Sequence, residues 1–300
     1  MTYHPRTAPD ESGLITSREN PWLKRFRAAL RGTGPAESEA IGVEGPKLVE
    51  DALRACLEPE ALLVSESAEP ALDTILRAAS ASEAGIPRSR ILRTTDKLFA
   101  NVAGTETPQG IAALFRAPQW KFEDILRGAA DETGALSGAS PLVVVIAGVQ
   151  DPGNVGTIVR SAEAFGATGV IAARGTADPW SPKALRASAV SALRLPLLRG
   201  IAIPVLLAQL KIAQVKIIAM SGRRLDSSPA ASRASPAYPD LREPSAIFVG
   251  NEGVGLAREV LLSADGTISI PMHASVDSLN AGVAASIALF EAAHRRSSAS

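Results

Sequence analysis

Three short polar segments in the second half of the chain carry the side chains best suited to chemistry. They are residues 151–160 (DPGNVGTIVR), 248–256 (FVGNEGVGL) and 270–280 (IPMHASVDSLN). Each follows an apolar, strand-like run and leads into a helix-like stretch, with glycine, asparagine, serine or an acidic side chain at the junction. Because open parallel sheets bind ligands at the carboxyl ends of their strands, the three junctions predict one composite site.

The first segment provides a fixed positive charge. A Pro-Gly pair predicts a turn, and Asn154 is suited to cap the helix that begins there. At about 100° per residue, the apolar residues of this helix share one face, whereas Gly156, Arg160 and Glu163 lie on another. The Arg160 guanidinium could therefore stand near the strand ends. The alternative is a surface ion pair between Arg160 and Glu163.

The second segment is rich in glycine and contains one carboxylate, Glu252. Its run from Gly250 to Gly255 could be mistaken for a dinucleotide-binding loop. That fingerprint follows the first strand of a βαβ unit and needs an acidic residue about twenty positions further on, which is missing here. A nicotinamide-dependent enzyme is therefore the less favoured interpretation. We expect instead that the glycines let backbone amides approach a ligand and that Glu252 accepts hydrogen bonds.

The third segment combines a strand end with a helix start. Pro271 lacks a backbone donor, which suits the end of a strand. Ser278 is suited to cap the last helix, with Leu279 and Asn280 in its first turn. Gly282 lies among many alanines in this helix (residues 280–293), which predicts close packing against another backbone. An ordinary buried helix is the alternative.

Composition limits the class of protein. Three hundred residues with 46% hydrophobic content are enough for two domains with their own cores. No apolar run of about eighteen residues predicts a membrane span, and the first twenty residues contain no stretch suited to a signal peptide. The single cysteine, Cys56, fits a reducing compartment, and the three histidines are too scattered to bind a metal. We expect a metal-free cytoplasmic protein.

The remaining sequence predicts the α/β elements that position the three segments. Residues 141–296 contain five short apolar runs typical of buried parallel strands: 142–147, 169–173, 215–219, 246–249 and 267–270. Residues 15–120 form a smaller α/β region, with helices expected at 20–30, 46–57 and 70–81 and strands at 61–64 and 111–115. We expect a disordered start at residues 1–14 and a linker at residues 121–140.

Basic side chains gather in the first region although the formal net charge is zero. Residues 18–31 contain five of them against a single acid, Glu19: Arg18, Lys24, Arg25, Arg27 and Arg31. A local basic stripe of this kind can bind nucleic-acid phosphates even in a neutral chain. A solvated helix face is the alternative.

Together the three segments resemble the motifs of the SpoU family of RNA ribose 2′-O-methyltransferases, over roughly residues 142–295. The matching positions are Asn154, Gly156 and Arg160 in the first motif, Gly250, Glu252 and Gly253 in the second, and Ile270, Pro271, Met272, Ser278, Leu279 and Asn280 in the third. One position departs, because Ala274 stands where the family usually has glycine. The extra methyl group could weaken or reshape cofactor binding.

The first region resembles the L30-like module of one branch of that family. Residues 15–21, 43–49 and 107–111 carry the likeness. The resemblance therefore implies an L30-like RNA substrate-binding domain at residues 15–120 and a SpoU methyltransferase domain at residues 141–296. It also implies a parallel-sheet α/β fold with a C-terminal trefoil knot, and a homodimer. Because the branch with this module acts mainly on ribosomal RNA, 23S rRNA is favoured as the substrate over tRNA.

The resemblance further implies S-adenosylmethionine as cofactor, with Gly250, Ile270, Met272 and Leu279 beside it. Catalysis would fall to Arg160, assisted by Asn154, Glu252, Ser278 and Asn280. The family's usual account makes Arg160 a general base, whereas we favour a guanidinium that stays protonated and holds a phosphate and the developing alkoxide. The sequence leaves both versions open. A non-catalytic RNA-binding or ribosome-assembly protein with the same fold, and a tRNA 2′-O-methyltransferase, are the alternatives.

Overall fold

The computed structural model describes residues 14–33, 40–55, 57–81, 90–127, 140–221, 239–272 and 278–297. The chain forms two compact units, Met1–Pro118 with Trp180–Pro182, and Gln119–Pro179 with Lys183–Ser300. Cys56, Ala274, residues 1–13 and residues 128–139 lie outside the described part. The expected disorder of the start, and a linker beyond residue 127, therefore stay predictions.

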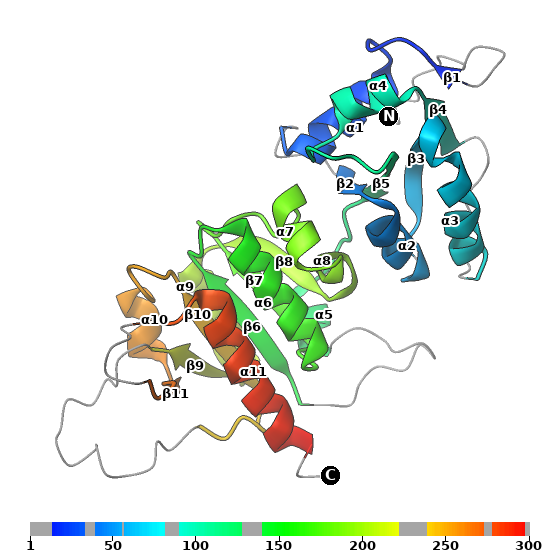
Figure 1. Cartoon of the computed structure of the whole chain (residues 1–300). Helices are drawn as coiled ribbons and strands as arrows, with labels where there is room; N and C mark the ends of the chain where they lie inside the picture. The colour runs from blue at the N-terminus through cyan, green and yellow to red at the C-terminus, as the bar shows by residue number, and fades with distance from the viewer. Residues whose placement is uncertain are drawn as a thin grey trace. The chain divides into compact units, whose positions relative to one another are not determined.

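The first unit is a five-stranded mixed sheet with the strand order β1-β4-β3-β5-β2 (Figure 1). Strand β5 runs antiparallel to both of its neighbours, whereas the other pairs are parallel. The elements in chain order are β1 (Leu14–Ile15), α1 (Pro21–Arg31), β2 (Ala40–Glu44), α2 (Pro46–Arg54), β3 (Pro59–Ser65), a short 3₁₀ turn η1 (Glu66–Ala68), α3 (Glu69–Ala81), β4 (Ile91–Thr94), α4 (Asp96–Val102) and β5 (Ile111–Arg116).

Helix α1 forms as its sequence predicts. The Asn20 side chain accepts a hydrogen bond from the Trp22 backbone N–H at 2.9 Å, and Pro21 occupies the first helical position. Gly32 ends the helix in the left-handed region at a φ of 64°. The buried side chains are Leu23, Phe26 and Leu30.

The basic side chains of α1 are partly engaged within their own unit. Arg25 forms an ion pair with Glu60, and its guanidinium lies 4.8 Å from the centre of the Trp22 ring. Arg31 donates hydrogen bonds to the Asn101 carbonyl at 2.9 Å and to the Ala103 carbonyl at 3.2 Å. Arg25 and Arg31 therefore anchor α1 to its neighbours, so the expected phosphate-binding stripe cannot use all of its charges freely.

The second unit is a six-stranded sheet with the order β11-β9-β10-β6-β7-β8, and every pair in it is parallel. Its elements are α5 (Phe122–Arg127), β6 (Leu142–Ala147), α6 (Pro152–Ala164), β7 (Gly169–Ala173), α7 (Pro182–Ala187), α8 (Ser191–Arg194), β8 (Leu197–Ile201), α9 (Ile203–Ile212), β9 (Lys216–Met220), β10 (Ser245–Gly250), α10 (Arg258–Ser263), β11 (Gly266–Ile268) and α11 (Ala281–Ser297). The predicted α/β class and parallel sheet are confirmed. The knot stays a prediction.

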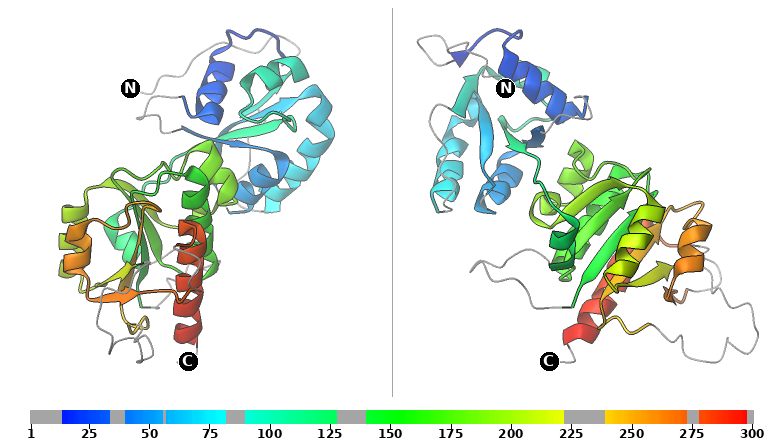
Figure 2. Two further views of the ribbon diagram at one scale, coloured as in Figure 1. Left: turned by 60° about the vertical axis from the view of Figure 1, so that its left-hand side comes forward. Right: turned by 180° about the vertical axis from the view of Figure 1, so that it is seen from behind.

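Helices cover both faces of this sheet. On one face α5, α9 and α10 share a core with the strands, to which Ile125, Leu206 and Val260 contribute. Ile125 belongs to the segment expected as a linker, so residues 122–127 are part of the packed unit instead. On the other face α6 and α11 lie side by side (Figures 1 and 2). Ser161 and Ser286 join these two helices through a hydrogen bond of 2.7 Å between their hydroxyls.

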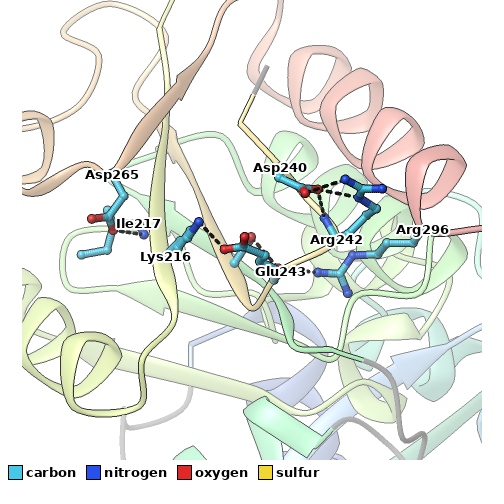
Figure 3. A network of polar contacts seen from close by, with 8 residues as sticks. Lys216, Ile217, Asp240, Arg242, Glu243, Asp265 and Arg296 are labelled. Atoms are coloured by element: carbon cyan, nitrogen blue, oxygen red, sulfur yellow. Dashed lines mark hydrogen bonds and ion pairs between the residues drawn. The ribbon is translucent and has the colours of Figure 1, made fainter. Parts of the chain in front are cut away.

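The amino-terminal edge of the second sheet has a polar network of its own (Figure 3). Arg296, in the last turn of α11, donates hydrogen bonds to the carbonyls of Ser140, Pro141, Leu241 and Glu243. Burial lowers the pKa of this guanidinium. Two ion pairs lie beside it, Lys216 with Glu243 and Arg242 with Asp240. The network holds the end of α11 at the edge opposite the three polar segments.

Candidate functional site

The three polar segments meet at the carboxyl edge of the second sheet. Gly250 pairs with Ala147 in the parallel register, so β10 and β6 end level with each other. A cavity of about 470 Å³ opens at this edge, which is a size typical of small-molecule sites. Six of the nine expected site residues line it: Gly250, Glu252, Ile270, Met272, Ser278 and Leu279.

The lining of this cavity changes from apolar to polar toward solvent. Its buried floor is formed by Val249, Ile268 and Ala281. Its half-buried wall includes Gly250, Ile270, Met272 and Leu279. Its exposed rim includes Glu252, Ser278 and Val254. Such a site suits a small molecule with an apolar part, met at the mouth by a second and more polar reactant.

A single asparagine fixes the loop that follows β10. The Asn251 Nδ2 donates to the Gly148 carbonyl at 3.0 Å, and its Oδ1 accepts from the backbone N–H of Gly253 at 2.8 Å and of Val254 at 3.1 Å. The Gly255 N–H donates to the Asn251 carbonyl at 2.9 Å and closes the turn. We did not expect Asn251 as a site residue, although asparagine side chains are known to form turns by hydrogen bonding to the backbone two residues further on.

Gly250 is required by the path of this loop. A Cβ atom at this position would lie 2.6 Å from the Gly255 carbonyl carbon and 2.8 Å from the Leu256 nitrogen. We expected the glycines to let backbone approach a ligand. At Gly250 the closest approach is instead that of the loop's own backbone to the end of its strand.

Helix α6 is capped by Asp151, and the expected cap Asn154 is wrong. The Asp151 Oδ1 accepts a hydrogen bond from the Gly153 N–H at 3.2 Å. Proline favours the first helical position, so Pro152 makes the residue before it the cap. The ion pair with Lys183, together with the Gly153 N–H, lowers the pKa of the Asp151 carboxyl. Asn154 lies inside the first turn, where its amide is available for other partners.

Helix α11 is capped by Asn280, and the expected cap Ser278 is also wrong. The Asn280 Oδ1 accepts hydrogen bonds from the backbone N–H of Gly282 at 2.9 Å and of Val283 at 3.2 Å. The helix therefore begins at Ala281, two residues later than Ser278 would have started it. Ser278 remains outside the helix, exposed on the rim of the cavity.

Two hydrogen bonds join one residue from each polar segment. The Asn280 Nδ2 donates to the Asn154 Oδ1 at 2.8 Å. The Asn154 Nδ2 in turn donates to the Glu252 Oε1 at 2.5 Å. We call these two hydrogen bonds the Asn280–Asn154–Glu252 relay. It brings together three of the five side chains expected to be catalytic, and it ties both helix starts to the rim of the cavity.

Arg160 lies apart from the cavity of its own chain. Its side chain is exposed on α6 and makes no hydrogen bond or ion pair with the described residues. Glu163, its alternative partner, binds Arg194 of α8 instead, with two hydrogen bonds of 2.6 and 2.8 Å. A Cβ on Gly156 would lie 2.4 Å from the Ala184 carbonyl oxygen, so this side of α6 faces α7 and α8. The off-core position of Arg160 agrees with its periodicity, but the structure does not place it at the cavity.

Within the described ranges, His, Cys, Asp and Glu side chains form no group of three suited to hold a metal ion. In that same part of the chain, no helix is long and apolar enough to cross a membrane.

Known proteins resemble this chain over most of its length. Residues 141–290 match the SpoU rRNA Methylase family, and residues 35–113 match the MRM3-like substrate binding domain. The chain is 29% identical to the 23S rRNA (guanosine(2553)-2′-O)-methyltransferase of Bacillus subtilis, with 92% of this chain and 97% of the relative covered. It is 32% identical to an uncharacterized tRNA/rRNA methyltransferase of Mycobacterium tuberculosis, with 92% and 81% covered.

A solved structure gives the same result for the fold. The AdoMet-bound rRNA methyltransferase from Sinorhizobium meliloti is 28% identical and superposes with a TM-score of 0.73, over 93% of this chain and 96% of that chain. The family model alone spans the strands, loops and helices that form the cavity. The family expected from the three motifs is confirmed, and this chain belongs to the SpoU rRNA methylase family.

Proposed function

We propose that the protein transfers a methyl group from S-adenosylmethionine to a ribose 2′-hydroxyl of RNA, with 23S rRNA as the favoured substrate. The observation that carries this proposal is the convergence of all three motif segments on one edge of the sheet, where the cavity opens. The activity for which the Bacillus subtilis relative is named and the bound AdoMet of the Sinorhizobium meliloti structure support it. The match of residues 35–113 to a substrate-binding domain provides a place for the RNA.

The cavity residues fit this cofactor. Ile270, Met272 and Leu279 present half-buried apolar surface for its adenosine and methionine parts, and the tight turn at Gly250 presents backbone groups beside them. When bound, S-adenosylmethionine would supply a methyl group made electrophilic by the sulfonium. The protein's own task is then to hold the ribose hydroxyl in line and to manage its proton.

The rim residues would carry that task. Glu252 and Ser278 are exposed at the mouth of the cavity, where the ribose would enter, and the relay fixes the position of Glu252. Arg160 would hold an RNA phosphate and the developing alkoxide through charge-assisted hydrogen bonds. We favour this role over that of a general base because a guanidinium normally stays protonated in proteins.

A homodimer would form through α11, and its exposed side is the favoured contact. Val283, Ile287 and Phe290 follow one another at helical spacing and are 47%, 42% and 57% exposed. The small residues of this helix, which we expected to pack closely against another backbone, face the interior of the same chain. A Cβ on Gly282 would lie 3.0 Å from the Thr157 Cγ2 of the same chain. In such a dimer Arg160, which lies apart from the cavity of its own chain, would serve the cavity of the other subunit.

Calorimetry tests the cofactor directly. Titration with S-adenosylmethionine and separately with NADH distinguishes the competing functions. Binding of S-adenosylmethionine alone supports the methyltransferase. Binding of neither ligand supports the non-catalytic RNA-binding alternative, which the departure from the family at Ala274 suggests. Binding of NADH alone contradicts the proposal.

A further inference from the structure

One apolar side chain interrupts the polar rim of the cavity. Val254 lines the cavity and is 90% exposed, more than any other large hydrophobic residue of the described ranges. The other apolar lining residues, such as Ile270 and Leu279, are half-buried in the wall. Because Val254 stands at the mouth of the cavity, its aliphatic side chain is within reach of a reactant that enters there.

The loop holds Val254 in this position from both sides. Its backbone N–H is bound to the Asn251 Oδ1 at 3.1 Å, and Asn251 is itself tied to the Gly148 carbonyl at 3.0 Å. On the other side the Gly255 N–H donates a hydrogen bond to the Asn251 carbonyl at 2.9 Å. Val254 therefore cannot turn into the apolar wall unless this turn breaks. The hydrogen bonds of the loop therefore keep Val254 exposed.

We propose that Val254 is a substrate-binding residue that packs against the nucleobase of the target nucleotide. This inference rests on the proposed function, because it needs RNA at the mouth of the cavity. The wall residues Ile270, Met272 and Leu279 lie deeper, where the cofactor would bind, whereas Val254 stands on the solvent side. An apolar contact at that level reaches the flat face of a base, which RNA presents when the base is unstacked.

The contact would act on RNA binding and leave the chemical step unchanged. It is made before and during the reaction alike, so its loss raises the KM for RNA and leaves kcat unchanged. Val254→Ala removes two carbon atoms from a buried contact, which corresponds to roughly a ten-fold rise in that KM. Val254→Thr keeps the branched shape and replaces one methyl by a hydroxyl, so the KM rises in the same direction and by less.

The test uses the full chain and 23S rRNA from a strain that lacks the gene for this protein, so that the target ribose is unmethylated. Methyl transfer gives kcat and the KM for RNA, and calorimetry gives the Kd for S-adenosylmethionine, in the wild type, Val254→Ala and Val254→Thr. The matched control is Val205→Thr, because Val205 is 52% exposed on α9 and does not line the cavity. We expect a raised KM for both Val254 variants, an unchanged kcat and Kd, and wild-type values for Val205→Thr.

Two outcomes overturn the inference while the proposed function stands. An unchanged KM for RNA shows that Val254 touches no substrate. A Kd for S-adenosylmethionine that rises by the same factor as the KM assigns the contact to the cofactor instead. Failure of the wild type to methylate any RNA is a separate result, which removes the proposed function itself.

Discussion

At the scale of single residues, the relay has a fixed direction. The Asn280 Oδ1 accepts from two backbone N–H groups, so the Asn280 Nδ2 is the atom left to face Asn154. Asn154 must then present its oxygen to Asn280 and its Nδ2 to Glu252. The orientation of both amides follows from helix capping, and the chain of donors ends on a carboxylate.

Replacing the Asn154 amide by a carboxylate should break the relay, and replacing the Glu252 carboxylate by an amide as well should restore it. Asn154→Asp places a carboxylate against Glu252, so we expect a lower Tm and weaker S-adenosylmethionine binding. Adding Glu252→Gln provides a donor toward Asp at position 154 and should recover part of both losses. The coupling energy from the double-mutant cycle should be on the order of 1–3 kcal/mol. Additive effects of the two changes would show that the relay carries no coupling.

Arg160 should matter for turnover and hardly at all for folding. Its side chain is exposed and makes no polar contact with the described residues, so Arg160→Ala should keep the Tm and the Kd for S-adenosylmethionine. Turnover should fall about 10²-fold or more, the scale of one lost oxyanion donor. Arg160→Lys serves as a comparison, because activity that rises with pH would favour a general base.

Mixing subunits shows which cavity Arg160 serves. Dimers that combine one Arg160→Ala subunit with one Glu252→Ala subunit should regain activity only if Arg160 acts across the dimer. Turnover of Arg160→Ala close to that of the wild type would remove the residue from the mechanism altogether.

At the scale of elements, periodicity and turn residues could predict most of the second sheet. Five of its six strands coincide with the short apolar runs of the sequence, and α1 begins where Asn20 and Pro21 indicate. Strand β8 was missed because it contains Arg199 and Gly200, both exposed at the edge of the sheet. The two helix caps were wrong for another reason. Each helix start has two residues able to cap it, and local sequence does not show which of them does so. At α6 the Asn154 amide belongs to the relay, whereas at α11 Asn280 both caps the helix and joins the relay.

The contact between α6 and α8 predicts a dependence of stability on pH. Burial alone would raise the pKa of Glu163, but the hydrogen bonds from Arg194 and Ser191 outweigh it and lower the pKa below 4.5. A carboxyl with a lowered pKa in the folded state stabilises the fold above its unfolded pKa, and this stabilisation is lost as the pH falls through the folded value.

Glu163→Gln should therefore cost about 1 kcal/mol at neutral pH. The difference in Tm between the wild type and Glu163→Gln should stay constant above pH 4.5 and shrink below it. Thermal melts from pH 7 to pH 3 give this difference directly. A difference that persists at pH 3 would mean that packing, and not charge, is lost in the variant.

At the scale of the whole molecule, α11 has two sides with different roles. Its small inward residues pack against α6, and its exposed apolar residues would form the subunit contact in the proposed dimer. The sequence showed that the helix is crowded with small residues, but it could not show which side faces the protein's own core. The expectations of a trefoil knot and of a homodimer come from the family resemblance alone, because general topology rules make a knot rare.

Two substitutions in α11 should separate these roles. Ile287→Asp places a charge in the exposed stripe, so sedimentation should shift from dimer to monomer while the Tm changes little. Gly282→Leu overfills the contact with Thr157 and should destabilise the subunit by about 1–3 kcal/mol. A dimer that survives Ile287→Asp would place the subunit contact elsewhere.

The most direct measurement is methyl transfer from labelled S-adenosylmethionine to 23S rRNA taken from a strain that lacks the gene, followed by mapping of the modified nucleotide. We expect one methyl group on a ribose 2′-oxygen, and loss of that product with Glu252→Ala. The Glu252 carboxylate lies at the mouth of the cavity, held there by Asn154. A methyl group found on a base, or full activity of Glu252→Ala, would contradict this expectation.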